Sequence, residues 1–190
     1  ILITSGSQQG LDFTGKIFLN PEDVVLCESP SYLGAINAFK AYECGFKEIE
    51  TDKDGMVLSH LEEVIKNTPN VKFIYVIPNF QNPSGRTWSE ARRRGLVEIA
   101  NQYDLVIIED NPYGELRFEG DVIGAIKSYD TEGRVVYLGT FSKTFSPGLR
   151  IGWVLASPEV LNKYIMVKQG ADLQTSSISQ RELNQFLEMY

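Results

Sequence analysis

The chain has 190 residues, of which 43% are hydrophobic and 23% charged, a composition typical of a soluble globular protein with one substantial core. Its formal net charge of -7 argues against binding of a nucleic-acid backbone or an anionic membrane surface. Two cysteines and one histidine provide neither a disulfide framework nor a metal-ligand set, so we expect no metal site and a reducing cytoplasm. No apolar run approaches the roughly 20 residues that a membrane span requires.

Seven short apolar runs predict strands. In chain order they cover residues 1–4, 24–28, 46–50, 73–77, 105–109, 135–140 and 151–156, and helical stretches separate most of them. The run Val106-Ile107-Ile108 is apolar at consecutive positions, which is typical of a strand that is covered on both faces. This alternation predicts an α/β fold with three layers (αβα) around a seven-stranded, mostly parallel sheet.

Several helices have recognisable start signals. Thr87 and Glu90 fit a capping box that opens a helix from about Trp88 to Gln102, whose arginines should face solvent. Ser157-Pro158 predicts the start of a helix over residues 159–169. A last helix is expected over residues 179–190 without a stop signal, and the first residues already have a strand pattern. We therefore expect a fragment of a longer protein.

Polar residues gather directly after four of the predicted strands. Ligands of open parallel sheets bind beyond the carboxyl ends of the strands, so these segments should meet at one edge. They are residues 5–9, 78–85, 110–113 and 140–150. The first is a glycine-containing turn before a helix, with the hydroxyl of Ser7 and the amide of Gln8. It suits a phosphate at a helix N-terminus, although a plain N-cap turn is the commoner explanation of such a motif alone.

The last of these segments contains a lysine among hydroxyl groups. A lysine is most often a solvated surface charge, but Lys143 is followed by Arg150 after a Pro-Gly turn. Partial desolvation beside an arginine would leave the lysine amine free to attack a carbonyl and form a Schiff base. The planar guanidinium of Arg150 is suited to binding a phosphate.

Asp110 ends a strongly apolar strand and should be buried, so it needs a cationic or N–H partner. A carboxylate placed against a pyridinium nitrogen makes pyridoxal phosphate an electron sink, and Tyr113 lies within reach of the ring hydroxyl in such an arrangement. The alternative interpretation of Asp110 is a structural acid that caps the next loop.

Together the four segments resemble the fold-type I pyridoxal-phosphate enzymes, specifically the class I/II aminotransferases. The resemblance extends over residues 4–173, and residues 142–150 are its most specific part. Residues 6–9, 78–83 and 168–172 are most similar to the 2-aminoadipate, kynurenine and multi-substrate branch. The resemblance implies the large domain of these enzymes, with a seven-stranded sheet in which the strand at 151–156 is antiparallel.

The resemblance also implies a role for each polar residue. Lys143 would form the Schiff base with pyridoxal 5'-phosphate and act as the general base, and Asp110 would pair with the pyridine nitrogen. Tyr113 and Asn82 would hold the ring hydroxyl. Tyr32 would stack on the ring, although a tyrosine at a helix start is more often plain packing. The phosphate would be surrounded by Ser7, Gln8, Thr140, Ser142 and Arg150. Thr140 stands where relatives often have serine, which keeps the hydroxyl.

By the same resemblance, residues 1–190 are the cofactor-binding large domain. The N-terminal segment that lines the substrate pocket and the C-terminal small domain with its carboxylate-binding arginine would be absent, so the piece alone should be inactive. The whole protein would transfer an amino group from 2-aminoadipate or an aromatic or branched-chain amino acid to a 2-oxo acid such as 2-oxoglutarate. We expect a cytoplasmic homodimer in which this segment binds neither nucleic acid nor membrane.

Three other functions remain open from the sequence. Certain winged-helix transcription regulators fuse a DNA-binding domain to an aminotransferase-like effector domain with the same cofactor lysine. Another reaction of the same fold, such as β-elimination or decarboxylation, would use the same lysine segment. Finally, the piece could be an inert scaffold on its own.

Overall fold

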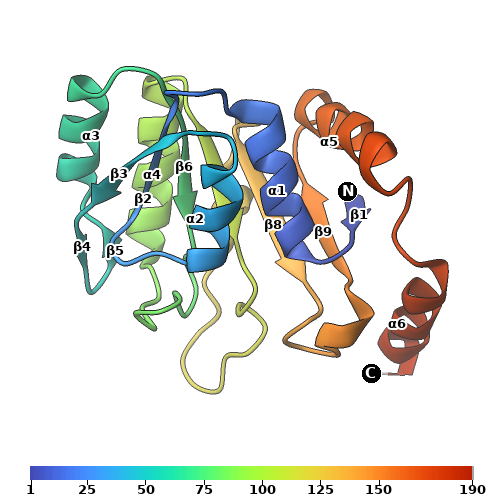
Figure 1. Cartoon of the computed structure of the whole chain (residues 1–190). Coiled ribbons are helices and arrows are strands. Elements are labelled where there is room, and N and C mark those ends of the chain that lie inside the picture. The colour runs from blue at the N-terminus through green and yellow to red at the C-terminus, as the bar shows by residue number, and fades with distance from the viewer. Residues whose placement is uncertain (190) are drawn as a thin grey trace.

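Seven strands form one sheet in the computed structural model, which describes residues 1–189 (Figure 1). They are β1 (Leu2–Thr4), β2 (Val24–Glu28), β3 (Gly45–Ile49), β6 (Val71–Val76), β7 (Val106–Asp110), β8 (Val135–Thr140) and β9 (Gly152–Leu155), in the order β1-β9-β8-β7-β6-β2-β3. β9 is antiparallel to both neighbours, and the other pairs are parallel. The seven-stranded sheet and its antiparallel last strand are confirmed. A small hairpin of β4 (Thr51–Asp52) and β5 (Gly55–Met56) was not predicted.

Helices cover both faces of the sheet. The helices are α1 (Ser7–Phe18), α2 (Leu33–Lys40), α3 (Leu58–Asn67), α4 (Glu90–Gln102), α5 (Pro158–Ala171) and α6 (Ser177–Met189), with short 3-10 turns η1 (Ile126–Tyr129) and η2 (Pro147–Leu149). One core contains Leu11 of α1, Phe39 of α2 and Tyr164 of α5, and the other contains Leu61 of α3 and Leu96 of α4. Each buried side chain of this size stabilises the fold by about 1.5–3 kcal/mol. The expected three layers are confirmed.

The last helix, α6, lies beyond the β1 edge of the sheet (Figure 1). Tyr190, which ends the helix expected from the sequence, is outside the described residues. Within residues 1–189 no helix combines the length and the apolarity that crossing a membrane requires. α5 begins at Pro158, as expected from Ser157-Pro158, but the Ser157 side chain makes no capping hydrogen bond.

Helix α4 begins two residues later than expected. Its N-cap is Ser89, whose side chain accepts a hydrogen bond from the Arg92 N–H, whereas Thr87 accepts one from the Phe80 N–H at 3.1 Å. Trp88 therefore precedes the helix, where it is fully buried. The capping box was wrong because a serine two residues downstream competes for the same role and Thr87 is needed in the preceding loop.

The expectation that every arginine of α4 faces solvent is wrong for Arg93, which is fully buried. Its guanidinium donates hydrogen bonds to four acceptors, namely the carbonyl oxygens of Trp88, Gly124 and Pro78 and the side chain of Asn79. A buried guanidinium is tolerated when its donors are satisfied in this way. Helical periodicity could not show these partners because three of them lie in the loop before the helix and one in a distant loop.

The topology brings four chain segments to one end of the sheet. β6, β7 and β8 are parallel, so the loops that follow them leave at the same end (Figure 1). β1 is antiparallel to β9, which is itself antiparallel to β8. The turn after β1 therefore emerges beside the loop after β8. The polar segments identified in the sequence meet at this end.

Candidate active site

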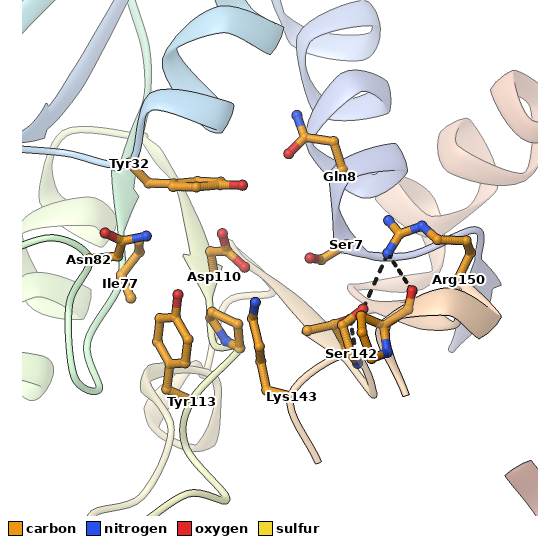
Figure 2. A pocket seen from close by; sticks show the side chains of 13 residues that line it. Ser7, Gln8, Tyr32, Ile77, Asn82, Asp110, Tyr113, Ser142, Lys143 and Arg150 are labelled. Carbon is orange, nitrogen blue, oxygen red and sulfur yellow. Dashed lines mark hydrogen bonds between the residues drawn. The ribbon is translucent and has the colours of Figure 1, made fainter. Parts of the chain in front are cut away.

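A cavity of about 210 Å³ lies at this end of the sheet. Figure 2 shows the side chains that line it, which come from well-separated parts of the chain. The lining includes all ten residues to which the resemblance assigns a cofactor role: Ser7, Gln8, Tyr32, Asn82, Asp110, Tyr113, Thr140, Ser142, Lys143 and Arg150. Ile77, Pro112 and Pro147 complete it.

Asp110 is the last residue of β7 and is 2% exposed. One carboxylate oxygen, Oδ2, accepts a hydrogen bond of 2.9 Å from the phenol of Tyr75 on β6. The other, Oδ1, is buried without a hydrogen-bond partner among residues 1–189. Burial raises the pKa of Asp110 to about 6, and the hydrogen bond from Tyr75 opposes this rise. Tyr75 is therefore the one hydrogen-bond partner of this carboxylate among residues 1–189, and the cationic or N–H partner expected from the sequence stays a prediction for Oδ1.

Lys143 lies in the turn after β8, and its side chain is exposed. Its Nζ atom is 6.0 Å from the centre of the Tyr113 ring. Figure 2 shows Lys143, Tyr113 and Asp110 pointing into the same space. The partial desolvation expected for the lysine is not seen for this exposed side chain.

Tyr32 lies across the cavity from Tyr113 (Figure 2), at the N-cap position of α2. Burial, together with the nearby carboxylate of Asp110, raises the pKa of its phenol. Asn82 belongs to the loop after β6 and precedes a cis proline. Neighbouring Gln81 is buried and donates a hydrogen bond of 2.7 Å to the Pro30 carbonyl, which joins the loops that carry Asn82 and Tyr32.

Hydroxyl and guanidinium donors gather at the opposite side of the cavity. Arg150 donates hydrogen bonds of 3.2 Å from Nη1 to the Ser142 hydroxyl and to the Pro147 carbonyl (Figure 2). The Ser142 N–H and hydroxyl both contact Oγ1 of Thr140, at 3.1 and 3.0 Å. Ser7 begins α1 on the same side. We call Ser7, Thr140, Ser142 and Arg150 the anion corner.

The backbone beside the anion corner leaves room for the guanidinium of Arg150. Gly6 has φ 83°, in the left-handed region that favours glycine, and a Cβ there would collide with the guanidinium of Arg150. The helix that begins at Ser7 leaves its first N–H groups without partners inside the helix. Helix N-terminal N–H groups beside an arginine form a site for an anion such as phosphate. The Gln8 amide donates to the Gly34 carbonyl at 2.9 Å instead, which joins α1 to α2.

A chain of polar side chains behind the cavity was not identified in the sequence. Arg93 donates to Asn79 at 2.8 Å, Asn79 donates to Asn111 at 2.9 Å, and Asn111 donates to the Tyr137 hydroxyl at 2.9 Å. These contacts connect the ends of β6 and β7 to β8. Asn111 directly follows β7 and Asn79 lies three residues after the end of β6, so both belong to polar segments that the sequence indicates, although their contacts could not be read from it. Tyr137 and Tyr75 lie inside strands, where the sequence pattern indicates only packing.

The chain belongs to the aminotransferase class I and II family, whose model matches residues 1–188. It is 51% identical over 184 residues to aromatic-amino-acid aminotransferase 1 of Thermococcus litoralis, covering 95% of this chain and 44% of that protein. It is 41% identical to the 2-aminoadipate transaminase of Thermus thermophilus, covering 98% of this chain and 48% of that protein. The chain therefore spans less than half the length of these relatives.

Solved structures agree with this assignment. The crystal structure of Pyrococcus horikoshii kynurenine aminotransferase, described as a complex with PMP, matches with a TM-score of 0.91 and 48% identity over 94% of this chain and 45% of that one. The names of these relatives support the 2-aminoadipate and kynurenine branch. A Bacillus subtilis HTH-type transcriptional regulator, YisV, matches at 36% identity. Because relatives named aminotransferases are more similar than this one, the regulator alternative is not favoured.

Proposed function

We propose that the whole protein is a pyridoxal-phosphate-dependent aminotransferase and that this chain is its cofactor-binding large domain. One observation carries the proposal: a single cavity joins an exposed lysine amine, a buried carboxylate with one unpartnered oxygen, and the anion corner. These three groups match the aldehyde, the pyridine nitrogen and the phosphate of the cofactor. The unpartnered Oδ1 of Asp110 is the strongest sign of fit, because a buried carboxylate oxygen normally has a donor.

Each group of the cofactor would have its own residues. The anion corner, with the first turn of α1, would bind the phosphate. Asn82 and Tyr113 would hold the ring hydroxyl, and Tyr32 would pack on the ring face from the side opposite Tyr113. Oδ1 of Asp110 would accept the N–H of the pyridine ring, while Tyr75 keeps Oδ2 in place.

When it is bound, the cofactor supplies an electron-poor ring that stabilises negative charge at the α-carbon of an amino acid. Asp110 has a pKa of about 6, so its carboxylate is largely ionised at neutral pH and can hold a proton on the ring nitrogen. Lys143 would hold the aldehyde through Nζ. Once a substrate amine has replaced it, the same Nζ would accept the proton from the substrate α-carbon as a general base.

We further propose that the amino donor is 2-aminoadipate or an aromatic or branched-chain amino acid, and that the acceptor is a 2-oxo acid such as 2-oxoglutarate. The names of the relatives support these classes. We also propose a homodimer in the cytoplasm. The location rests on the two cysteines, Cys27 and Cys44, which are both unpaired.

Replacing the lysine in the whole protein tests the proposal. Lys143→Ala should abolish the cofactor absorbance change on addition of pyridoxal phosphate and reduce amino transfer by about a thousandfold or more, because anchor and base are lost together. Lys47→Ala, at an exposed lysine of β3 outside the cavity, is the matched control and should behave as the unaltered protein. Retained amino transfer in Lys143→Ala would contradict the proposal.

A donor screen separates amino transfer from other reactions of the same fold. The unaltered protein should convert 2-oxoglutarate to glutamate in step with loss of the donor. Release of ammonia with pyruvate would indicate β-elimination, and release of carbon dioxide would indicate decarboxylation. Either product without glutamate would replace the proposed reaction. Titration of residues 1–190 alone with pyridoxal phosphate tests the inert scaffold, which predicts no change in cofactor absorbance.

A further inference from the structure

Lys168, near the C-terminal end of α5, is 4% exposed although lysine is usually a surface residue. Its ammonium donates three hydrogen bonds: to Oδ1 of Asp172 at 2.7 Å, to the Thr175 hydroxyl at 3.1 Å and to Oε1 of Gln9 at 3.2 Å. An ammonium has three donors, so all of them are used. A buried charge is retained only when it is paired in this manner.

Two partners of Lys168, Asp172 and Gln9, each accept a hydrogen bond from Ser5, one from its side chain and one from its backbone. Oδ2 of Asp172 accepts a hydrogen bond of 2.9 Å from the Ser5 hydroxyl and one of 2.8 Å from Nε2 of Gln9. Oε1 of Gln9 accepts the Ser5 backbone N–H at 2.9 Å. Lys168 therefore orients both the carboxylate and the amide that fix Ser5.

Ser5 is two residues before Ser7 of the anion corner, and only Gly6 separates them. Gly6 has a positive φ and no side chain, so its own conformational preference does not fix the turn. The turn has local hydrogen bonds, from the Gly6 N–H to the Thr4 carbonyl at 2.9 Å and from the Thr4 hydroxyl to the Gly6 carbonyl at 3.0 Å. The contacts on Ser5 add a second set, which ties the turn to the C-terminal end of α5. Thr175, the third partner of Lys168, also contacts the Ile3 carbonyl of β1 at 3.5 Å, which adds an attachment on the preceding strand.

We propose that Lys168 is a positioning residue for the phosphate site: through Asp172 and Gln9 it holds the Ser5–Ser7 turn in the conformation that binds the cofactor phosphate. This proposal rests on the proposed function. It gives a role to the Lys168–Asp172 segment, whose two charged ends are four residues apart on α5 and its C-cap and form an ion pair. Lys168 touches neither the cavity nor its lining residues in the contacts described for residues 1–189, so it acts through the turn.

The test compares two ligands in the whole protein. The dissociation constants of pyridoxal phosphate and of pyridoxal, which lacks the phosphate, are measured by fluorescence titration for the unaltered protein and for Lys168→Met. We expect pyridoxal phosphate to bind about tenfold more weakly, as when outer hydrogen-bond partners of a site are removed, while pyridoxal binding is unchanged. Lys163→Met, at an exposed lysine of the same helix, is the matched control and should keep both constants.

The ratio of the two constants distinguishes positioning from plain stabilisation of the fold. A Lys168→Met variant that loses both ligands equally, or neither, would overturn the proposal. If that variant does not fold, Asp172→Asn decides, because it conserves shape at a side chain that is 28% exposed and should show the same selective loss. If the unaltered protein does not prefer pyridoxal phosphate over pyridoxal, the proposed function itself fails, and the Lys168 proposal fails with it.

Discussion

Tyr75 donates its phenol hydrogen to Oδ2 of Asp110 across 2.9 Å, between the adjacent strands β6 and β7. Both side chains are buried. The contact fixes the rotation of the carboxylate and leaves Oδ1 as the oxygen that lacks a partner within residues 1–189. It also favours the ionised carboxylate, since a hydrogen bond to the charged form lowers the pKa of an acid.

Replacing Tyr75 by phenylalanine should therefore change the pH dependence of cofactor binding. Without its hydrogen bond, the pKa of Asp110 should rise above its present value of about 6, by roughly one unit for the loss of a hydrogen bond to a charged group. The affinity for pyridoxal phosphate, measured from pH 5 to 8, should fall on the acid side of this range (the acid limb), and the midpoint of this fall should move to higher pH by the same amount.

Tyr164→Phe is the control for Tyr75→Phe, because it removes another fully buried phenol, one that contacts Thr14 at 2.7 Å instead of Asp110. Its acid limb should not move. If the two variants give superimposable pH profiles, Tyr75 does not act on Asp110 in the way that we describe.

The stability of the cofactor-free protein should fall as the pH rises from about 4 to 7. Burial raises the pKa of Asp110 from 3.8 to about 6, so the folded state favours the protonated acid more than the unfolded state does. The contribution of Asp110 to the free energy of unfolding is fully present below its pKa in the unfolded state, and it is lost as the pH rises through its pKa in the folded state. A shift of this size corresponds to about 3 kcal/mol. Glu28 and Glu109, both raised to about 7 by burial, act in the same direction.

Asp110→Asn isolates the share of that pH dependence that belongs to Asp110. Urea unfolding at pH 4, 5, 6 and 7 should show a decrease in unfolding free energy that is about 2–3 kcal/mol smaller in the variant than in the unaltered protein. The two buried glutamates should keep a residual slope. Parallel curves for the two proteins would show that the carboxyl of Asp110 titrates normally in the folded state.

The strands and the cavity lining could be predicted from the sequence for one physical reason. Strands that are buried on both faces, such as Val106–Asp110, appear as continuous apolar runs, and parallel strands present their carboxyl ends at one edge. The polar segments after those runs had to meet, and they supply nine of the ten expected cofactor residues that line the cavity, whereas Tyr32 was available only from the resemblance. The antiparallel β9 was available only from the resemblance, because its own sequence does not indicate direction.

The partners of buried polar groups could not be predicted in the same way. Arg93 is buried because the carbonyls of Pro78 and Gly124 lie within its reach, and those loops come together only in the folded chain. Tyr75 pairs with Asp110 through strand register. Lys143 is exposed although it lines the cavity, and its exposure depends on the surrounding loops and not on the residues next to it in the sequence.

Gly6→Ala should damage the anion corner. An alanine at φ 83° is strained by about 1–2 kcal/mol, and its methyl group would collide with the guanidinium of Arg150, which would have to move away from Ser142. We expect a loss of stability of that order in thermal unfolding, together with weaker binding of pyridoxal phosphate. Gly170→Ala, in α5 with open space around the new methyl group, should keep the affinity and gain up to about 1 kcal/mol of stability. Equal affinities in the two variants would contradict the role given to Gly6.

Arg93→Met should destabilise the protein far more than Arg94→Met, although the two arginines are adjacent in α4. The buried guanidinium of Arg93 satisfies Pro78 and Gly124 carbonyls and the Asn79 side chain, so its removal leaves buried acceptors without donors and should cost about 3 kcal/mol or more in urea unfolding. Arg94 is more than half exposed and pairs with Glu90, so its loss should cost less than about 1 kcal/mol. Because the Pro78 loop continues to Asn82 at the cavity, Arg93→Met should also weaken cofactor binding, and an unchanged affinity would show that the loop is held by other contacts.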